Sequence, residues 1–544
     1  MYDHKFRVII IGAGLSGIIA AQRYLDVHSQ TRLVILEKDK HVGGVFSQSR
    51  TYGVFWTQWT VGLSEYSDMP MQRPPESDCR NDFYRAKWTT HYLEQYVDRK
   101  DEQGHTLRDR IRFGIDVENI KKVRTSWKIS CKDAAGSTHT FDAKKLLIAS
   151  GLTSVPDMPF FSGAEEFEGP ILHSGDFGAR EHDILSSEGI KKIAIIGGGK
   201  SSADMLYSAV KAGKEVSWII RTTGTGAAMP NEAASSRIVA SISPSIFNAK
   251  NWWTYFLHST SVGTWLLRCL IAKMDAEVRN EANYKGRESV KGFEKLEYDA
   301  PLFWQNGTGG LLHHHDFWDL VAKNVYIYRD TVTSASKGLV HLSSGESLQC
   351  DAILCGTGWI PSLNFIHEEE LVRLGLPHNP NALTRSIKDK WSSLEATADK
   401  KITSTYPLLV NPPPHPHKPH LLTPYRLYRH MLPLSGPSVL FLNHVKTGYK
   451  ILIAEAQAIW AVAHFSGHLT PPSSAQMEEE VALWVAFSKS RYLSAGEEGN
   501  NVAFESVTYA DCLLRDLGCR AQGKGKGWWR DLVEPFWPRD LGRA

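Results

Sequence analysis

The chain has 544 residues, more than one hydrophobic core usually serves, so two or three domains are expected. Its hydrophobic fraction of 42% and charged fraction of 22% are those of an ordinary globular protein. The formal net charge of +3 gives no reason to expect a nucleic-acid partner. The seven cysteines include no C-x-x-C pair, so we expect neither a metal site nor a disulfide framework, and a reducing cytoplasmic compartment fits best.

No targeting or membrane-spanning segment is expected. The first strand is predicted from Phe6, which leaves no room for a signal peptide. The most apolar window, 252–274, is interrupted by His258 and Arg268 and lacks a run of about 18 apolar residues. We interpret this window as a lid or an interfacial helix, with at most a weak membrane contact.

A first nucleotide-binding unit is predicted at residues 6–38. A buried strand is followed by a G-x-G-x-x-G turn, an amphipathic helix and a second strand. The three glycines allow a tight turn, close approach to a pyrophosphate and close helix–strand packing, and the helix start directs free N–H groups at the phosphates. Glu37 comes twenty residues after Gly17, where a carboxylate can accept both ribose hydroxyls. The predicted contacts are Gly12, Gly14, Ser16, Gly17, Glu37 and Lys38.

The next segment is glycine-rich and then aromatic. Gly44, Val45 and Phe46 follow the second strand and are further predicted cofactor contacts. The stretch 51–71 then holds several aromatic residues, at a position that faces the reactive ring in a dinucleotide enzyme. These side chains either wall a ring system or belong to the core, and the sequence leaves both interpretations open.

A second nucleotide-binding unit begins with the strand 192–196. It continues with G-x-G-x-x-S, a helix and another strand, and Arg221 ends that strand nineteen residues after Ser202. An arginine fork binds a 2′-phosphate, whereas a carboxylate repels one. Charge-assisted hydrogen bonds of this kind favour NADPH over NADH by roughly ten- to a hundredfold. The predicted contacts are Gly197, Gly199, Lys200, Ser201, Ser202 and Arg221.

These units predict an α/β fold with two Rossmann-like dinucleotide-binding domains, one for FAD and one for NADPH. Residues 351–358 repeat the strand-to-turn pattern of 145–151, so the chain is expected to return to the first domain, with the NADPH domain inserted in the FAD domain. The expected segments are 1–165 (FAD), 166–335 (NADPH, with an irregular insertion at about 222–300), 336–470 (FAD again) and 471–544 (helices and tail).

The sequence resembles the flavin-containing monooxygenases over most of its length. Residues 167–177 match F-x-G-x-x-x-H-x-x-x-[F/Y/W], the most specific motif of that family. The stretches 66–70, 357–359 and 454–460 are similar to other elements of the family, and 426–429 and 509–518 look most like its fungal members. By this resemblance Thr357 and Gly358 belong to the second linker and contact a cofactor.

The resemblance implies a reaction. NADPH reduces FAD, O2 adds at flavin C4a, and retained NADP+ shields the peroxyflavin until a small organic substrate arrives. Related Baeyer–Villiger enzymes usually end the motif with tryptophan, so Phe177 favours N- or S-oxygenation or hydroxylation, within a secondary-metabolite pathway. Baeyer–Villiger oxidation of a ketone and a non-oxygenating flavin reductase are the alternatives.

The catalytic candidates are Gln58, Asp68 and Arg221. Gln58 stands where well-known members carry an asparagine beside the flavin, and Phe46 replaces a usual tryptophan. Asp68 either hydrogen-bonds near the active centre or caps a turn, and both interpretations stay open. His173 more plausibly couples domain movement than takes part in chemistry.

Two other classes of protein fit less well. A pyridine-nucleotide disulfide reductase needs a redox cysteine pair near the flavin, and residues 41–70 contain no cysteine. A non-enzymatic flavoprotein does not account for two nucleotide sites of opposite charge. The substrate pocket is expected to draw on residues 51–71, 222–300 and 411–430.

Overall fold

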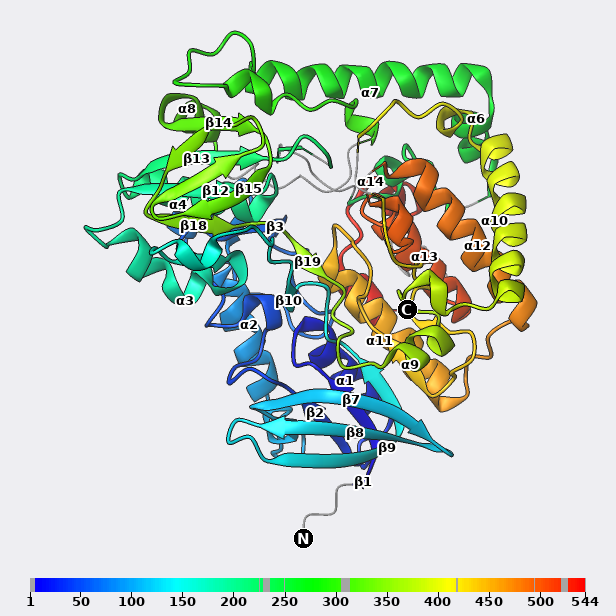
Figure 1. Cartoon of the computed structure of the whole chain (residues 1–544). Helices are drawn as coiled ribbons and strands as arrows, with labels where there is room; N and C mark the ends of the chain where they lie inside the picture. Colours follow the sequence, from blue (N-terminus) through cyan, green and yellow to red (C-terminus); the bar gives the residue numbers. More distant parts are fainter. Residues whose placement is uncertain are drawn as a thin grey trace.

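The computed structural model describes residues 5–224, 226–227, 235–248, 250–304, 314–416, 419–493, 495–519 and 527–543. Two sheets organise these residues, the first at the bottom of Figure 1 and the second at its upper left. The helices of the C-terminal half gather to the right of both.

The first sheet is built around a central strand whose inner residues, 8–11, are all buried. Its strands in spatial order are β6 (Ile111–Arg112), β2 (Leu33–Leu36), β1 (Lys5–Ile11) and β9 (Thr138–Ile148); β9 is flanked further by β22 (Val439–Phe441) and by the antiparallel pair β8 (Ser126–Asp133) and β7 (Ile115–Val123). The strands β2, β1, β9 and β22 are parallel, so their carboxyl ends lie in one row.

The second sheet is entirely parallel. Its strands in spatial order are β11 (Ile171–His173), β18 (Ala352–Cys355), β12 (Lys192–Ile196), β13 (Glu215–Ile220) and β14 (Val325–Arg329). The helices of this unit include α3 (Ser174–Leu185), α4 (Lys200–Lys211) and α8 (Phe317–Asn324). The chain leaves the first sheet after β9 and rejoins it at β22, so the second unit is inserted in the first. The predicted fold class is confirmed.

The predicted return to the first domain at residue 336 is wrong. Residues 332–349 form a ribbon of three strands, β15 (Val332–Ser336), β16 (Leu339–Leu342) and β17 (Ser347–Gln349), and β18 then pairs between β11 and β12 of the second sheet. The error has a physical reason, because buried parallel strands of both sheets read as the same short apolar run. The chain crosses back at β19 (Trp359–Ile360), which pairs antiparallel with β10 (Val155–Pro156) of the outgoing link.

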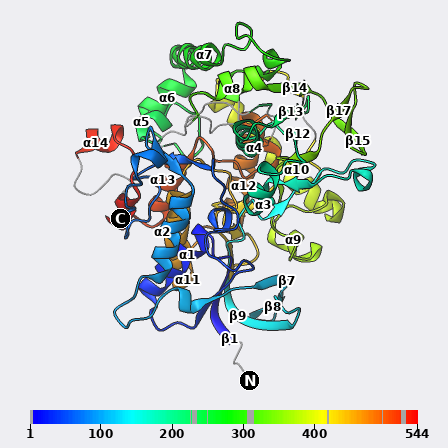
Figure 2. The same ribbon diagram turned by 90° about the vertical axis from the view of Figure 1, so that its left-hand side faces the viewer.

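The described part of the expected irregular insertion at 222–300 contains three helices. It holds α5 (Arg237–Ala240), α6 (Trp252–Ser259) and α7 (Ser261–Ala282). The side chains of Asn251 and Thr260 cap the second and third of these helices. Figures 1 and 2 both place α7 on the outer edge of the molecule, far from β1. Within the described ranges, no helix is both long and apolar enough to cross a bilayer.

The C-terminal half contributes a helical layer to the first unit. The helix α11 (Lys450–Ser466) is buried on almost every side and packs along α1 (Leu15–Val27). A helix that is apolar all round needs such cover. Further helices of this layer are α10 (Arg385–Thr405), α12 (Ser474–Arg491), α13 (Ser506–Asp516) and α14 (Trp528–Val533).

An ion-pair network joins α1 to α11. The guanidinium of Arg23 donates to Glu455 through Nε at 3.1 Å and Nη2 at 2.7 Å, and its Nη2 lies 3.0 Å from a carboxylate oxygen of Asp68. The backbone N–H of Ser67 also donates to Glu455, whose side chain is fully buried. Arg23 therefore holds α1, α11 and the turn at 66–70 together.

We expect Arg23→Ala to lower the free energy of unfolding by about 3–5 kcal/mol, because it leaves the carboxylate of Glu455 buried without its cation. Urea unfolding measures this loss. The control is Arg73→Ala, since Arg73 is half exposed and pairs with Glu76 and Asp82 at the surface. That change should cost less than about 1 kcal/mol. Equal losses in the two variants would contradict the role given to Arg23.

Candidate active site

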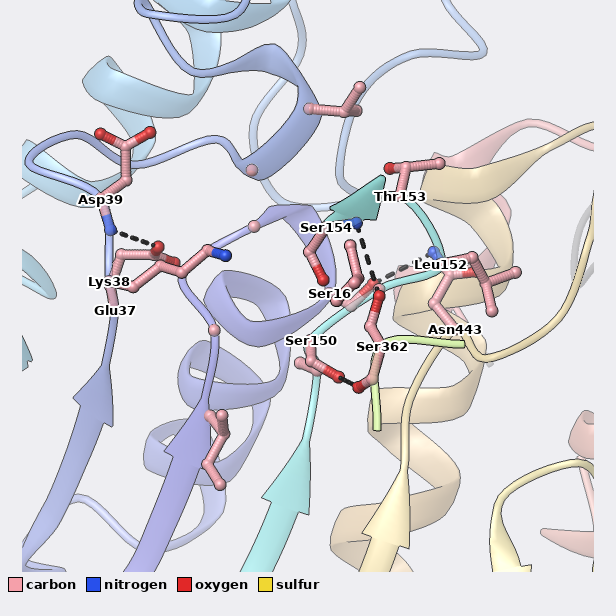
Figure 3. A pocket seen from close by; sticks show the side chains of 18 of the residues that line it. Ser16, Glu37, Lys38, Asp39, Ser150, Leu152, Thr153, Ser154, Ser362 and Asn443 are labelled. Carbon is pink, nitrogen blue, oxygen red and sulfur yellow. Dashed lines mark hydrogen bonds between the residues drawn. The ribbon is translucent and has the colours of Figure 1, made fainter. Parts of the chain in front are cut away.

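A cavity of about 240 Å³ runs across the carboxyl ends of β2, β1, β9 and β22 (Figure 3). Ligands of open α/β sheets bind at this edge. Of the predicted cofactor contacts in the first unit, the cavity is lined by Gly12, Gly14, Ser16, Glu37, Lys38, Gly44 and Val45.

The glycine turn of the first unit is set by two different requirements. A Cβ atom on Gly12, which has φ +102°, would lie 2.5 Å from the carbonyl oxygen of Ala149, and one on Gly17 would lie 1.9 Å from the carbonyl oxygen of Gly12. The protein itself therefore excludes a side chain at these two positions. At Gly14 the nearest atom would be the Cα of Gly44 at an ordinary 3.7 Å. The missing side chain of Gly14 thus leaves room for a ligand.

Glu37 lies at the β2 end of the cavity. Its two carboxylate oxygens accept the backbone N–H groups of Ala13 at 2.6 Å and Asp39 at 2.9 Å. Burial raises the pKa of Glu37, and these two hydrogen bonds oppose the shift. A carboxylate has about four acceptor sites, so capacity remains for the two hydroxyls of a ribose. Lys38 is exposed beside it.

The aromatic residues after this unit are mostly core. The ring of Phe46 is buried, 5.7 Å from that of Phe55 and 5.3 Å from that of Trp59. Trp59 and Tyr66 belong to the same hydrophobic core. Phe46 is absent from the described lining of the cavity, whereas its neighbour Val45 is present. The core interpretation therefore holds for these three aromatic residues.

The structure does not bring two of the catalytic candidates to the cavity. Gln58 lies on β3 (Trp56–Thr60) with its side chain exposed, and Asp68 lies in the Arg23 network. Neither is among the described residues that line the cavity. Asp68 also accepts from Tyr96 and Arg99, and although burial opposes the shift, these contacts lower its pKa. These contacts give Asp68 a structural role, and its catalytic role stays a prediction.

Sequence reasoning missed functional candidates on the far side of the cavity. Asn443 follows β22 with φ +55°, and its Nδ2 donates to the hydroxyl of Ser16 at 3.1 Å. Its Oδ1 is buried and has no partner among the described residues. Lys450 begins α11, and burial lowers the pKa of its ammonium to about 8. The signal in the sequence was the position of Asn443 two residues after a buried strand, since Glu37 also follows one closely.

A third missed residue is Arg50. Its Nη2 donates to the carbonyl oxygen of Thr153 at 2.7 Å, and its guanidinium lies 5.0 Å from the ring of Trp359 in β19. Arg50 therefore joins the cavity wall to the link between the two units.

In the second unit a glycine on the facing strand replaces the third glycine of the motif. Gly197 has φ +116°, and a Cβ on it would lie 2.3 Å from the carbonyl oxygen of Gly356. A Cβ on Gly356 would lie 2.0 Å from the Oγ of Ser202. Ser202 can therefore replace the third glycine of the motif because Gly356, which it faces, has no side chain. Nothing lies within 4 Å of a Cβ on Gly199, and Ser201 beside it is half-buried.

Lys200 does not point its ammonium freely at a ligand. It forms an ion pair with Asp204 one helical turn later, whose carboxylate is fully buried. Tyr52 of the first unit donates to the same carboxylate at 2.9 Å. Burial raises the pKa of Asp204, and Lys200 opposes that shift. Lys200 thus contributes to a contact that ties the two units together, and its contact with a cofactor stays a prediction.

Arg221 occupies the position that corresponds to Glu37. It directly follows β13, the neighbour of β12, just as Glu37 follows β2, the neighbour of β1. Its side chain is exposed, and its Nε donates to the carbonyl oxygen of Thr223 at 3.1 Å. Two structurally equivalent positions thus carry opposite charges.

Thr357 and Gly358 lie in the returning link. Thr357 donates through Oγ1 to the carbonyl oxygen of Asp157 at 2.6 Å. His173 donates through Nε2 to the carbonyl oxygen of Gly358 at 2.9 Å, while its Nδ1 accepts the N–H of Gly175 at 3.1 Å. Burial lowers the pKa of His173, which favours this neutral tautomer. These bonds agree with a coupling role for His173.

The cysteines show no redox pair. All seven lie in the described part of the chain, all are free, and none lines the cavity. Among the described residues, no group of three or more His, Cys, Asp or Glu side chains could hold a metal ion. A second cavity of about 990 Å³ takes its lining partly from 246–259 and Arg429, two of the segments expected around the substrate, and not from 51–71.

Comparisons with known proteins agree with this architecture. A family model described as "Pyridine nucleotide-disulphide oxidoreductase" matches residues 9–256. A protein named FAD-dependent monooxygenase from Aspergillus nomiae is 30% identical, with 99% of this chain and 97% of the relative covered. Another of that name from Aspergillus sclerotiorum is 31% identical over 96% and 94%. The NADP+-bound cyclohexanone monooxygenase of Rhodococcus sp. Phi1 shares the fold, with a TM-score of 0.60, 14% identity and coverage of 95% and 97%.

The two glycines predict separable effects. We expect Gly17→Ala to lower the melting temperature of the FAD-free protein, or to prevent folding, because the new Cβ overlaps the carbonyl oxygen of Gly12. We expect Gly14→Ala to leave that temperature unchanged and to weaken FAD binding at least about tenfold. Thermal unfolding and a fluorescence titration with FAD measure both. Unchanged FAD affinity in Gly14→Ala would show that this position is not used by the cofactor.

Proposed function

The chain belongs to the family of FAD-dependent monooxygenases, and from this premise we propose that it uses NADPH and O2 to insert one oxygen atom into a small organic molecule. As a member of this family it is an oxidoreductase. The observation that carries the proposal is the contrast between Glu37 and Arg221 at equivalent strand ends. The carboxylate suits the ribose hydroxyls of FAD, and the guanidinium suits the 2′-phosphate of NADPH.

The order of strands in the first sheet supports an orientation for FAD. If Glu37 at the end of β2 takes the ribose and the turn after β1 takes the pyrophosphate, the ends of β9 and β22 remain for the flavin half. Bound FAD supplies the redox chemistry. The chain supplies the amide of Asn443, with its unpartnered Oδ1, and positive charge from Lys450 and the start of α11. The Oδ1 of Asn443 would accept a hydrogen bond from the flavin, and Lys450 with the start of α11 would favour negative charge on the ring.

For the reaction type we propose N- or S-oxygenation or hydroxylation. Support comes from Phe177, which stands where Baeyer–Villiger relatives usually carry tryptophan. Its ring is fully buried and lies edge-on to that of Tyr52 at a centroid distance of 5.3 Å. Phe177 therefore acts through the packing between the units. The resemblance to fungal members also supports a role in secondary metabolism.

Anaerobic mixing followed by oxygen tests the proposal. NADPH should bleach the bound flavin under nitrogen, and on mixing with O2 the release of H2O2 should lag behind the consumption of O2. An oxidase would release H2O2 without a lag, and a flavin reductase would pass its electrons to an added acceptor in preference to O2. Either result would contradict a monooxygenase.

Arg221→Ala tests the NADPH site. The ratio of kcat/KM for NADPH to that for NADH should fall about ten- to a hundredfold, through the NADPH value alone, because one charge-assisted contact is lost. The control is Arg180→Ala, since Arg180 is an exposed arginine of α3 that pairs with Asp183. It should leave the ratio unchanged. An unaltered ratio in Arg221→Ala would remove this residue from the 2′-phosphate site.

A further inference from the structure

An exposed apolar surface lies on the insertion between β13 and β14. We define the α6–α7 face by Trp252, Tyr255, Val262, Trp265, Leu266 and Leu270. Trp252 is 76% exposed, Tyr255 65% and Trp265 61%. On the surfaces of soluble proteins such residues usually occur singly. Their concentration on two consecutive helices therefore indicates an interaction surface.

The periodicity of α7 explains how this face forms. Its buried positions include Thr264, Leu267 and Ala282, which recur at helical spacing and pack against the body of the protein. Val262, Trp265 and Leu266 occupy the opposite side. The second half of the helix, from Asp275 on, is polar on that side. The apolar stripe is therefore confined to the half of α7 that adjoins α6.

The charged residues of the segment that carries the face have one sign, and Lys273 at its end lies 3.9 Å from Glu277 one helical turn later. Residues 250–274 include Lys250, Arg268 and Lys273, and no Asp or Glu. All three cations are exposed. Lysine and arginine that flank an apolar stripe extend their charged ends toward anionic headgroups while their methylene chains cover apolar surface. Tryptophan and tyrosine favour the same boundary between water and lipid.

The shape of the surface also favours a membrane over a second copy of the chain. Figures 1 and 2 show α7 as a straight helix along the rim of the molecule, farther from β1 than the second sheet. Such a ridge projects its side chains outward along a line, which fits the plane of a bilayer. We propose that the α6–α7 face docks on an anionic lipid bilayer, with the helices lying in the headgroup region and no segment crossing it.

Sedimentation of the FAD-loaded full chain with vesicles tests this proposal. The protein should pellet with vesicles of phosphatidylcholine and phosphatidylserine, and far less with phosphatidylcholine alone. Trp265→Glu should abolish pelleting, because it places a carboxylate in the face. Arg268→Gln with Lys273→Gln should weaken it about ten- to thirtyfold, as expected for two lost charges near an anionic surface. Unchanged pelleting of Trp265→Glu would overturn the proposal.

A matched control and a local probe complete the design. Phe160→Glu changes an aromatic residue that is 95% exposed and lies outside the face, so it should pellet like the wild type. Cys269 is exposed on α7, and the other six cysteines are buried or half-buried, so a polarity-sensitive dye can be attached to it selectively. Its emission should shift to the blue with anionic vesicles. Pelleting without that shift would place the contact elsewhere and refute the proposal.

Light scattering tests whether the α6–α7 face instead binds a second copy of the chain. A wild-type monomer in solution agrees with lipid docking. A dimer that Trp265→Glu converts into a monomer would make the face a contact between two copies of the chain, and the membrane proposal would then be wrong.

Discussion

The close approach of backbone to backbone at the carboxyl edge of the first sheet is the constraint on which the site depends. Gly12 leaves the strand with a positive φ, the carbonyl oxygen of Ala149 lies where its Cβ would be, and Gly17 brings the start of α1 onto that turn. These contacts set α1 tightly against β1 and β9, so four strand ends open into one cavity. The second unit reaches the same close approach differently, because the residue without a side chain is Gly356 after β18 and the first turn of the helix carries Ser202. The glycine that permits this packing can therefore stand on the helix, as Gly17 does, or after the neighbouring strand, as Gly356 does.

Two buried carboxylates of the described residues, Glu455 and Asp204, form ion pairs that join separate elements. The guanidinium of Arg23 forms ion pairs with Glu455 and Asp68. The ammonium of Lys200 forms an ion pair with Asp204, to which Tyr52 of the first unit also donates a hydrogen bond. A buried carboxylate without its cation would be costly, so these partners are fixed by the fold. At the two equivalent strand ends stand Glu37 in one unit and Arg221 in the other. The proposed assignment of FAD and NADPH to the two units is argued from the opposite charges of these two residues.

Features that depend on local sequence could be predicted, and features that depend on distant partners could not. The glycine turns, Glu37 and Arg221 each lie within about twenty residues of the strand that positions them, and the structure shows them at corresponding strand ends. The ion pairs of Asp68 could not be predicted because its partners come from other elements. The exposure of Gln58 could not be predicted either, because one strand position decides whether a side chain faces inward. The strand β18 was assigned to the wrong sheet because a short apolar run does not show which strands it pairs with. The window 252–274 was interpreted as a lid or an interfacial helix, and it forms α6 and most of α7, with Asn251 and Thr260 before them as caps.

The α6–α7 face and Arg221 belong to the same connection between β13 and β14. The insertion leaves the sheet immediately after Arg221 and returns at β14, so the loop that carries Arg221 is the first part of the connection to α6. That loop is also held from outside, because the N–H of Gly224 donates to the carbonyl oxygen of Pro416 at 3.0 Å. A surface contact can change the affinity of Arg221 for a nucleotide only if it has a different free energy in two arrangements of this loop. The hydrogen bond between Gly224 and Pro416 is therefore a contact that such a change of arrangement would have to alter or preserve.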